Sequence, residues 1–101
     1  MGFKEIKRKV IHCVLNGLYD HQVRNNIDVK NLFQCGIVDQ NMLAMLLHST
    51  RGNQYSVSPH HQAPSIDVHI FKPVFGRVEW YIKCYFVEPD AVFISVHQDG
   101  V

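Results

Sequence analysis

Histidine, tyrosine and lysine side chains alternate with apolar ones along residues 65–72, 79–87 and 91–97. Successive residues of a β-strand point to opposite faces of a sheet, so this alternation predicts one polar and one apolar face. A polar face that only met solvent would be expected to carry lysine, glutamate, threonine and serine. The predicted face instead carries Asp67, His69, Phe71, Tyr81, Lys83, Tyr85, Val87, Phe93, Ser95 and His97. Because imidazole titrates near neutral pH, such a face is suited to proton transfer beside a cation.

The turns between these strands predict which residues lie opposite each other. Three-residue loops at Val74–Gly76 and Glu88–Asp90 would align two cross-strand rows. The rows are His69–Tyr81–His97 and Asp67–Lys83–Ser95. Because neighbouring strands lie about 4.8 Å apart, each row would span about 10 Å, roughly one nucleotide step. The alternative is a set of ordinary cross-strand pairs, in which Asp67 and Lys83 form a surface ion pair.

A second polar group precedes the first of these strands. Proline after Ser58 favours an extended start to a loop, so His60 and His61 are expected to be exposed near the sheet. Arg51, just upstream, would be a phosphate contact or a solvated helix end. A zinc site built from one of these histidines and one on the sheet is an alternative, but the ligand spacing does not support it. We therefore expect no metal and no cofactor.

Helices are predicted for the first half of the chain. Apolar residues at three- and four-residue steps indicate an amphipathic helix from residue 3 to 18, with a basic face. Asp28 would cap a short helix that stops at Gly36, where glycine tolerates a left-handed conformation. A third helix would start after Asp39 and end at the break over residues 49–52.

The second half is predicted to form the sheet. The three alternating segments should pair as antiparallel hairpins, and residues 55–58 would add a fourth, shorter strand. The apolar positions expected beneath the helices are Ile66, Val68, Ile70, Trp80, Ile82, Cys84, Phe86, Val92, Ile94 and Val96. The sequence therefore predicts one α+β domain, residues 1–101. Its N-terminal helices, about 3–50, would pack on one face of a C-terminal antiparallel sheet of three to four strands, about 54–97.

Composition excludes several classes of protein. Of 101 residues, 47% are hydrophobic and 19% are charged, as in one globular domain. A net charge of +1 does not favour a protein that coats nucleic acid by charge alone. Three cysteines without a Cys-x-x-Cys pair predict reduced thiols. No apolar run reaches the roughly 20 residues that span a bilayer, and no secretory signal is recognisable, so we expect a cytoplasmic protein with no membrane partner.

Four short segments follow one another toward the C-terminus: Gln54–Ser56, Ser65–His69, Tyr81–Lys83 and Ser95–His97. Their order and spacing resemble the RelE superfamily of ribonuclease toxins, and most closely the MqsR-like mRNA interferases. That branch shows aromatic-Lys-Ser, Trp-Gln-Asp-Val-Tyr, Tyr-x-Lys and Ser-Phe-Lys. Tyr81 and Lys83 match the pattern, whereas Ser56, Ile66 and His97 replace two lysines and a glutamine.

The resemblance implies a RelE-like fold, mRNA as substrate, an antitoxin protein as partner and, in the ribosome-dependent case, the ribosome. RNA cleavage without a metal needs a base for the 2′-OH proton, a cation for the phosphorane-like charge and an acid for the leaving oxygen. A histidine pair would supply base and acid, in an order that stays open, Lys83 the cation, and Tyr81 a hydrogen bond or a proton. Tyr85, Phe71 and Phe93 would stack on unpaired bases.

We therefore predict a metal-independent endoribonuclease toxin of a type II toxin–antitoxin system. Its predicted catalytic residues are His60, His61, His69, Tyr81, Lys83 and His97, and its predicted substrate-binding residues are Arg51, Ser58, Asp67, Tyr85 and Ser95. The alternative is a non-catalytic binding or regulatory protein, of the antitoxin or immunity type, because aromatic residues are also enriched at protein interfaces. Growth arrest on expression without an antitoxin would distinguish the toxin from the binding protein.

Overall fold

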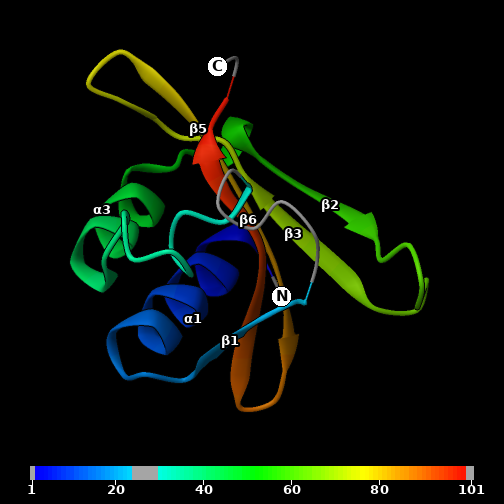
Figure 1. The fold of residues 1–101 in the computed structure, drawn as a ribbon. Coiled ribbons are helices and arrows are strands. Elements are labelled where there is room, and N and C mark those ends of the chain that lie inside the picture. Colours follow the sequence, from blue (N-terminus) through cyan, green and yellow to red (C-terminus); the bar gives the residue numbers. More distant parts are fainter. Residues whose placement is uncertain (1, 24–29, 100–101) are drawn as a thin grey trace.

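Two helices cover one face of a six-stranded sheet in the computed structural model (Figure 1), which describes residues 2–23 and 30–99. The elements in chain order are α1 (Phe3–Leu15), β1 (Tyr19–His21), α3 (Gln40–Ser49), the 3₁₀ turn η1 (Gly52–Gln54), β2 (Tyr55–Pro59), β3 (Asp67–Phe71), β4 (Val74–Phe75), β5 (Val78–Val87) and β6 (Asp90–Gln98). The predicted α+β class, with helices on one face of the sheet, is confirmed.

Helix α1 ends three residues earlier than its apolar periodicity predicts. Gly17 adopts φ +72°, and the N–H of Leu18 donates to the carbonyl of Cys13 at 2.9 Å. This is the Schellman arrangement that closes a helix at a left-handed glycine. Leu18 therefore packs against the core from a turn rather than from the helix.

Helix α3 begins as predicted. The Asp39 side chain accepts a hydrogen bond from the N–H of Met42 at 2.8 Å, which caps the helix. The predicted cap of the middle helix, Asp28, lies outside the described residues. Residues 32–36 form turns that end at Gly36, which has the expected positive φ of +82°.

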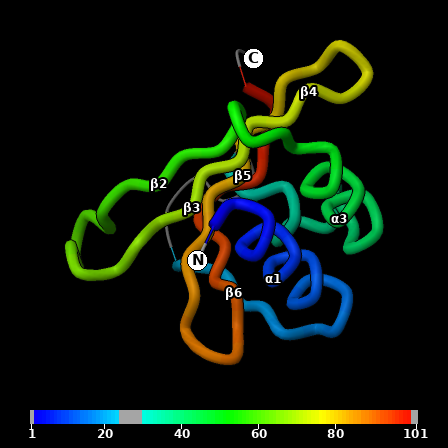
Figure 2. The backbone as a smooth tube through the Cα atoms, turned by 180° about the vertical axis from the view of Figure 1, so that it is seen from behind, coloured from blue at the N-terminus to red at the C-terminus, as the bar shows by residue number. Residues whose placement is uncertain are grey.

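One hydrophobic core joins the two helices to the sheet. The helices contribute Ile6, Val10, Cys13, Val14, Leu43, Leu46 and Leu47, and the sheet contributes Phe71, Trp80, Ile82, Cys84, Ala91, Phe93 and Val96. We call the sheet face that meets the helices the inner face and the opposite one the outer face. Seen from behind, the β2–β3 hairpin extends away from the helices and the β4–β5 hairpin rises above them (Figure 2).

The sheet has more strands than predicted, and it is mixed rather than wholly antiparallel. Its order is β1-β6-β5-β3-β2, with β4 paired to β5. Strand β1 pairs parallel to β6, with Tyr19 opposite Ala91. The prediction of three to four antiparallel strands was wrong because β1 is only three residues long and lies inside the segment read as helical.

The hairpin into β5 turns at Gly76–Arg77 rather than over Val74–Gly76. Both turn residues have positive φ, +60° and +66°. Two-residue turns of this kind match the right-handed twist of the strands and are favoured in hairpins. Val74 and Phe75, assigned to the loop by the sequence, therefore form β4 and pair with β5.

The position of the Gly76–Arg77 turn determines which side chains of β3 point toward the helices. His69 lies opposite Cys84 instead of Tyr81, three residues further along β5, and Ile70 lies opposite Lys83. An odd shift exchanges the two faces of a strand. Strand β3 therefore turns Asp67, His69 and Phe71 inward and Val68 and Ile70 outward, the reverse of the prediction.

The hairpin between β5 and β6 keeps the predicted pairs by a different route. Its loop has two residues, so Val87 lies opposite Asp90 rather than Ala91. A β-bulge in β6, opposite Lys83 and Cys84, adds one residue and so compensates for the shorter loop. Lys83 therefore faces Ser95, and Tyr81 faces His97. Beyond the bulge the faces exchange, so Phe93 pairs with Cys84 and is buried in the core. The predicted stacking roles of Phe71 and Phe93 are therefore wrong.

Candidate functional site

The outer face carries a stacked pair of rings at one end of β5 and β6. The rings of Tyr81 and His97 have centroids 5.3 Å apart and planes 15° apart. The Lys72 ammonium lies 5.5 Å from the centroid of the Tyr81 ring, within cation–π range. Tyr81 and His97 are half-buried, so both rings keep a solvent-facing side.

A backbone carbonyl orients the imidazole of His97. Its Nδ1 lies 2.9 Å from the carbonyl oxygen of Gln98, and since a carbonyl only accepts, Nδ1 must carry the proton. The other nitrogen, Nε2, then keeps its lone pair, and within residues 2–23 and 30–99 no hydrogen bond engages it. His97 thus has the arrangement of a general base, one nitrogen anchored and the other basic.

Lys83 occupies the next outward position along β5. Two strand residues span about 6.6 Å, which is the separation of its Cα from that of Tyr81 along the strand. Ser95 lies opposite it on β6 and is 5% exposed. Lys83 itself is half-buried, so its ammonium group can reach an anion bound over the outer face.

Beyond Lys83 the outer face opens into a pocket of about 340 Å³. Its apolar walls come from Pro59, Val68 and Ile94, and its polar rim comes from Gln22, His60, His61 and Gln62, with Lys83 at the boundary. The β-bulge in β6 adds Ile94 to this face. Bulges frequently aim a side chain toward a site in this way.

Two neighbours set the protonation of His60. The backbone N–H of Gln62 donates to Nδ1 at 3.1 Å, so the proton lies on Nε2, which donates to Oε1 of Gln22 at 3.0 Å. The rings of His60 and Tyr85 pack in a T-shaped arrangement, with centroids 4.9 Å apart and planes 82° apart. His60 is therefore a fixed wall of the pocket.

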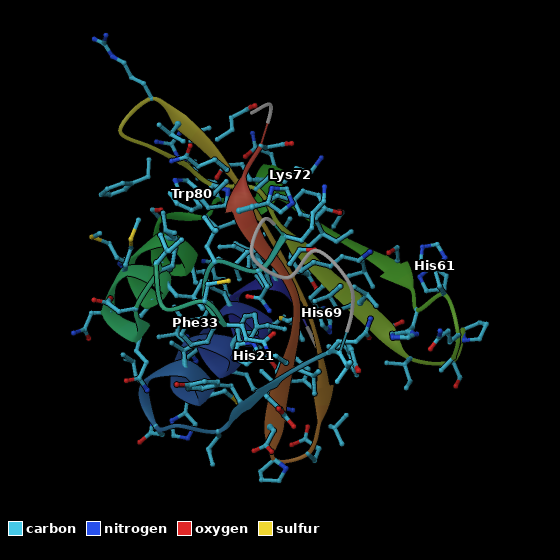
Figure 3. The ribbon with its side chains drawn as sticks, viewed as in Figure 1. His21, Phe33, His61, His69, Lys72 and Trp80 are labelled. Carbon is cyan, nitrogen blue, oxygen red and sulfur yellow. The ribbon has the colours of Figure 1, made fainter. Side chains whose placement is uncertain are left out.

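The remaining predicted residues of the loop lie around this pocket or away from it. Ser58 pairs with Val68 and is half-buried. His61 is exposed on the β2–β3 hairpin, away from Lys72 (Figure 3). Arg51 is exposed at the start of η1, and it does not line the pocket.

His69 and Asp67 are not part of the outer group. His69 is 6% exposed on the inner face, and its Nδ1 lies 2.7 Å from the Tyr55 hydroxyl. Burial lowers the pKa of His69 and raises the pKa of Tyr55, so both are neutral at pH 7. On its β5 side, β3 pairs His69 with Cys84 and Ile70 with Lys83, so the predicted rows that placed His69 beside Tyr81 and Asp67 beside Lys83 are wrong. The three-residue shift in β3 is the cause.

Gln22, Lys72 and Ile94 belong to the site but were not predicted. Gln22 follows β1, which the sequence did not reveal, and Ile94 faces outward only because of the bulge. Lys72 could have been found, because it continues the alternation of β3 once the register is known.

Much of the predicted basic face of α1 stabilises the fold. The Lys7 ammonium donates to the carbonyls of His48 and Thr50, at 3.1 and 3.2 Å, and so caps the end of α3. Lys9 forms an ion pair with Glu88 and lies 4.2 Å from the ring centroid of Phe86. These two lysines therefore have partners within the protein.

Within the part of the chain that the structure describes, no group of three or more His, Cys, Asp and Glu side chains is arranged to hold a metal ion. No helix in that part has the length and apolar character needed to span a membrane. Comparison of the sequence with protein families and with curated proteins, and of the structure with solved structures, gave no match.

Proposed function

We propose that this protein is a metal-independent endoribonuclease that cuts RNA on the outer face of its sheet. The observation that carries the proposal is the imidazole of His97, whose Nδ1 is anchored and whose Nε2 is basic. Tyr81 stacks on it, and Lys83 supplies a cation from the next outward position of β5, about 6.6 Å along the strand from Tyr81. A base, a proton donor and a cation on one exposed surface are the groups that RNA transesterification requires.

The proposed reaction assigns one step to each group. Nε2 of His97 removes the proton of a ribose 2′-OH, and the 2′ oxygen attacks the adjacent phosphorus. The bond from phosphorus to the 5′ oxygen breaks, and the hydroxyl of Tyr81 donates a proton to that oxygen. Lys83 stabilises the charge that builds on the phosphate oxygens. The products are a 2′,3′-cyclic phosphate and a 5′-hydroxyl end.

The proposal includes the toxin role that the RelE-like sequence pattern implied. It would place an antitoxin as the protein partner and mRNA, free or on the ribosome, as the substrate in the cytoplasm. Support comes from Tyr81 and Lys83, the two residues that match the family pattern, because both lie on the outer face beside His97. His97 stands at the position of the family's final lysine and would act as the base.

The test is incubation of the purified protein with a long RNA in EDTA, followed by analysis of the 3′ ends. We expect cyclic phosphates with the wild type and a large loss of cleavage with His97→Ala. His48→Ala, which removes an exposed histidine at the end of α3, is the matched control and should cleave normally. Intact RNA in all lanes, both with naked RNA and with translating ribosomes, would contradict the proposal.

A protein-binding role is the second candidate, and exposed apolar side chains favour it. Val74 and Phe75 on the β4–β5 hairpin are 49% and 41% exposed. Phenylalanine is among the residue types that are enriched at protein interfaces relative to the rest of the surface. Expression in cells without an antitoxin separates the two roles, because a binding protein should leave growth unchanged whereas the ribonuclease should arrest it.

A further inference from the structure

The pocket beside Lys83 is lined by both apolar and polar side chains. Among the apolar ones, Val68 and Ile94 are 1% and 6% exposed and Pro59 is exposed. Its volume of about 340 Å³ is at the small end of ligand pockets, which run from about 300 to 1,000 Å³. A single nucleobase suits both the size and the apolar walls.

The polar rim of the pocket is rich in hydrogen-bond donors. Because Nε2–H of His60 donates to Oε1 of Gln22, the amide of Gln22 is held with its oxygen toward His60. Its NH₂ group then points away from His60, and within the described residues no hydrogen bond engages it. The ammonium of Lys83 adds more donors at the boundary. Such a rim matches a ligand whose edge presents acceptors.

The pocket also lies at the right distance from the proposed cleavage site. Lys83 lines the pocket, and Tyr81 and His97 occupy the next outward positions, about 6.6 Å along the strands. A nucleotide that placed its base in the pocket would therefore set a neighbouring phosphate between Lys83 and His97.

We propose that this pocket binds one unstacked base of the RNA and prefers a base with a carbonyl oxygen at its edge, uracil, guanine or cytosine, over adenine, which has none. The inference rests on the proposed function, because it makes the pocket the specificity site of that ribonuclease. RNA-binding proteins commonly read single-stranded sequence by isolating a base between side chains and bonding its edge.

Binding of 2′-O-methyl hexanucleotides measures the preference without cleavage, because the attacking hydroxyl is blocked. The oligonucleotides are adenosines with one central uridine or guanosine, or with adenosine throughout, and fluorescence anisotropy gives the affinities. We expect the uridine or guanosine oligonucleotide to bind roughly 5-fold or more tightly than the adenosine one, the range of one good base contact. Gln22→Leu should bring the ratio close to one.

Gln22→Glu sharpens the test, because a carboxylate offers only acceptors. It should lower the preference for uridine over adenosine, since the two uracil oxygens lose a donor while the adenine amino group gains an acceptor. Gln34→Leu, the same change at an exposed position in the turn before α3, should keep the wild-type ratio. Circular dichroism reports whether each variant is folded.

Equal affinities in the wild type, or an unchanged ratio in folded Gln22→Leu, would overturn the inference. This result is separate from the proposed function. If the protein cut RNA with no base preference, the ribonuclease proposal would stand and the pocket proposal would fail. If it preferred uridine but cut no RNA, the pocket proposal would stand and the ribonuclease proposal would fail.

Discussion

A tyrosine and a histidine stack on each face of the sheet, and the two pairs differ mainly in what surrounds them. Tyr55 and His69 on the inner face have centroids 6.0 Å apart and planes 11° apart, whereas Tyr81 and His97 on the outer face have centroids 5.3 Å apart. The inner pair is joined by a hydrogen bond between its polar atoms. In the outer pair the imidazole bonds to the backbone instead, and Nε2 stays basic. The same two residue types thus form a buried structural contact on one face and a chemically available pair on the other.

The largest expected difference between the pairs is in RNA cleavage. Replacing His97 with alanine removes the proposed base, and general-base catalysis contributes about 10²–10⁴-fold, so cleavage should fall by that factor. Because His97 is half-buried, its loss should change the free energy of unfolding by less than about 1 kcal/mol. Cleavage assays and urea unfolding on one preparation measure both effects. Normal cleavage by His97→Ala would assign the chemistry to another residue.

The reverse pattern is expected for His69. Alanine at this position leaves a cavity under the sheet and an unpaired Tyr55 hydroxyl, so the free energy of unfolding should fall by about 2–4 kcal/mol. Its cleavage rate, measured well below the unfolding midpoint, should stay within a few-fold of the wild type. A loss of cleavage as large as that of His97→Ala, in folded protein, would mean that His69 takes part in catalysis after all.

The tyrosine hydroxyls offer a finer version of the same contrast. Tyr55→Phe removes the hydrogen bond to His69 and should cost about 1 kcal/mol of stability. Tyr81→Phe removes a hydroxyl that has no hydrogen bond among the described residues, so stability should change by less than about 0.5 kcal/mol. Thermal unfolding of the two variants side by side gives the comparison. Equal losses of stability would mean that the hydrogen bond between Tyr55 and His69 does not distinguish the inner pair from the outer pair.

Sequence reasoning placed the outer pair correctly and His69 wrongly, and two turns explain both outcomes. The pairing of Tyr81 with His97 was right because the bulge in β6 compensates for a loop one residue shorter than predicted. His69 was placed on the wrong face because Arg77 takes a positive φ, which a sequence pattern does not predict for arginine. A single turn residue therefore decided the face of a whole strand.

Other features depended on contacts between distant segments. Strand β1 pairs with a strand about seventy positions later, and three residues carry too weak an alternation to be recognised. The pocket needed β1, the bulge and the β2–β3 hairpin together, so no local pattern contained it. The amphipathic helix, the Asp39 cap and the long strands were predictable because each rests on local periodicity or capping.

The smallest effect we predict is the dependence of stability on pH, which comes from the inner histidines. Burial lowers the pKa of His69 and of His21, whose Nδ1 accepts from the side chain of Asn31 at 3.1 Å. Because both folded-state pKa values lie below the unfolded value of about 6.5, the unfolded chain binds protons first as the pH falls. Their contribution to stability is therefore complete above about pH 7, and it decreases as the pH falls from about 6.5 through the folded pKa values.

Urea unfolding of the wild type between pH 7.5 and 5 measures this slope, and variants assign it. His69→Leu should flatten the slope, since the unfolded state then has one fewer site that gains a proton before the folded state does. His48→Leu is the exposed control, and it should leave the slope as it is in the wild type. An equally steep slope in His69→Leu would show that His69 is protonated as readily in the folded state as in the unfolded chain. Burial under the sheet would then have no effect on the protonation of His69.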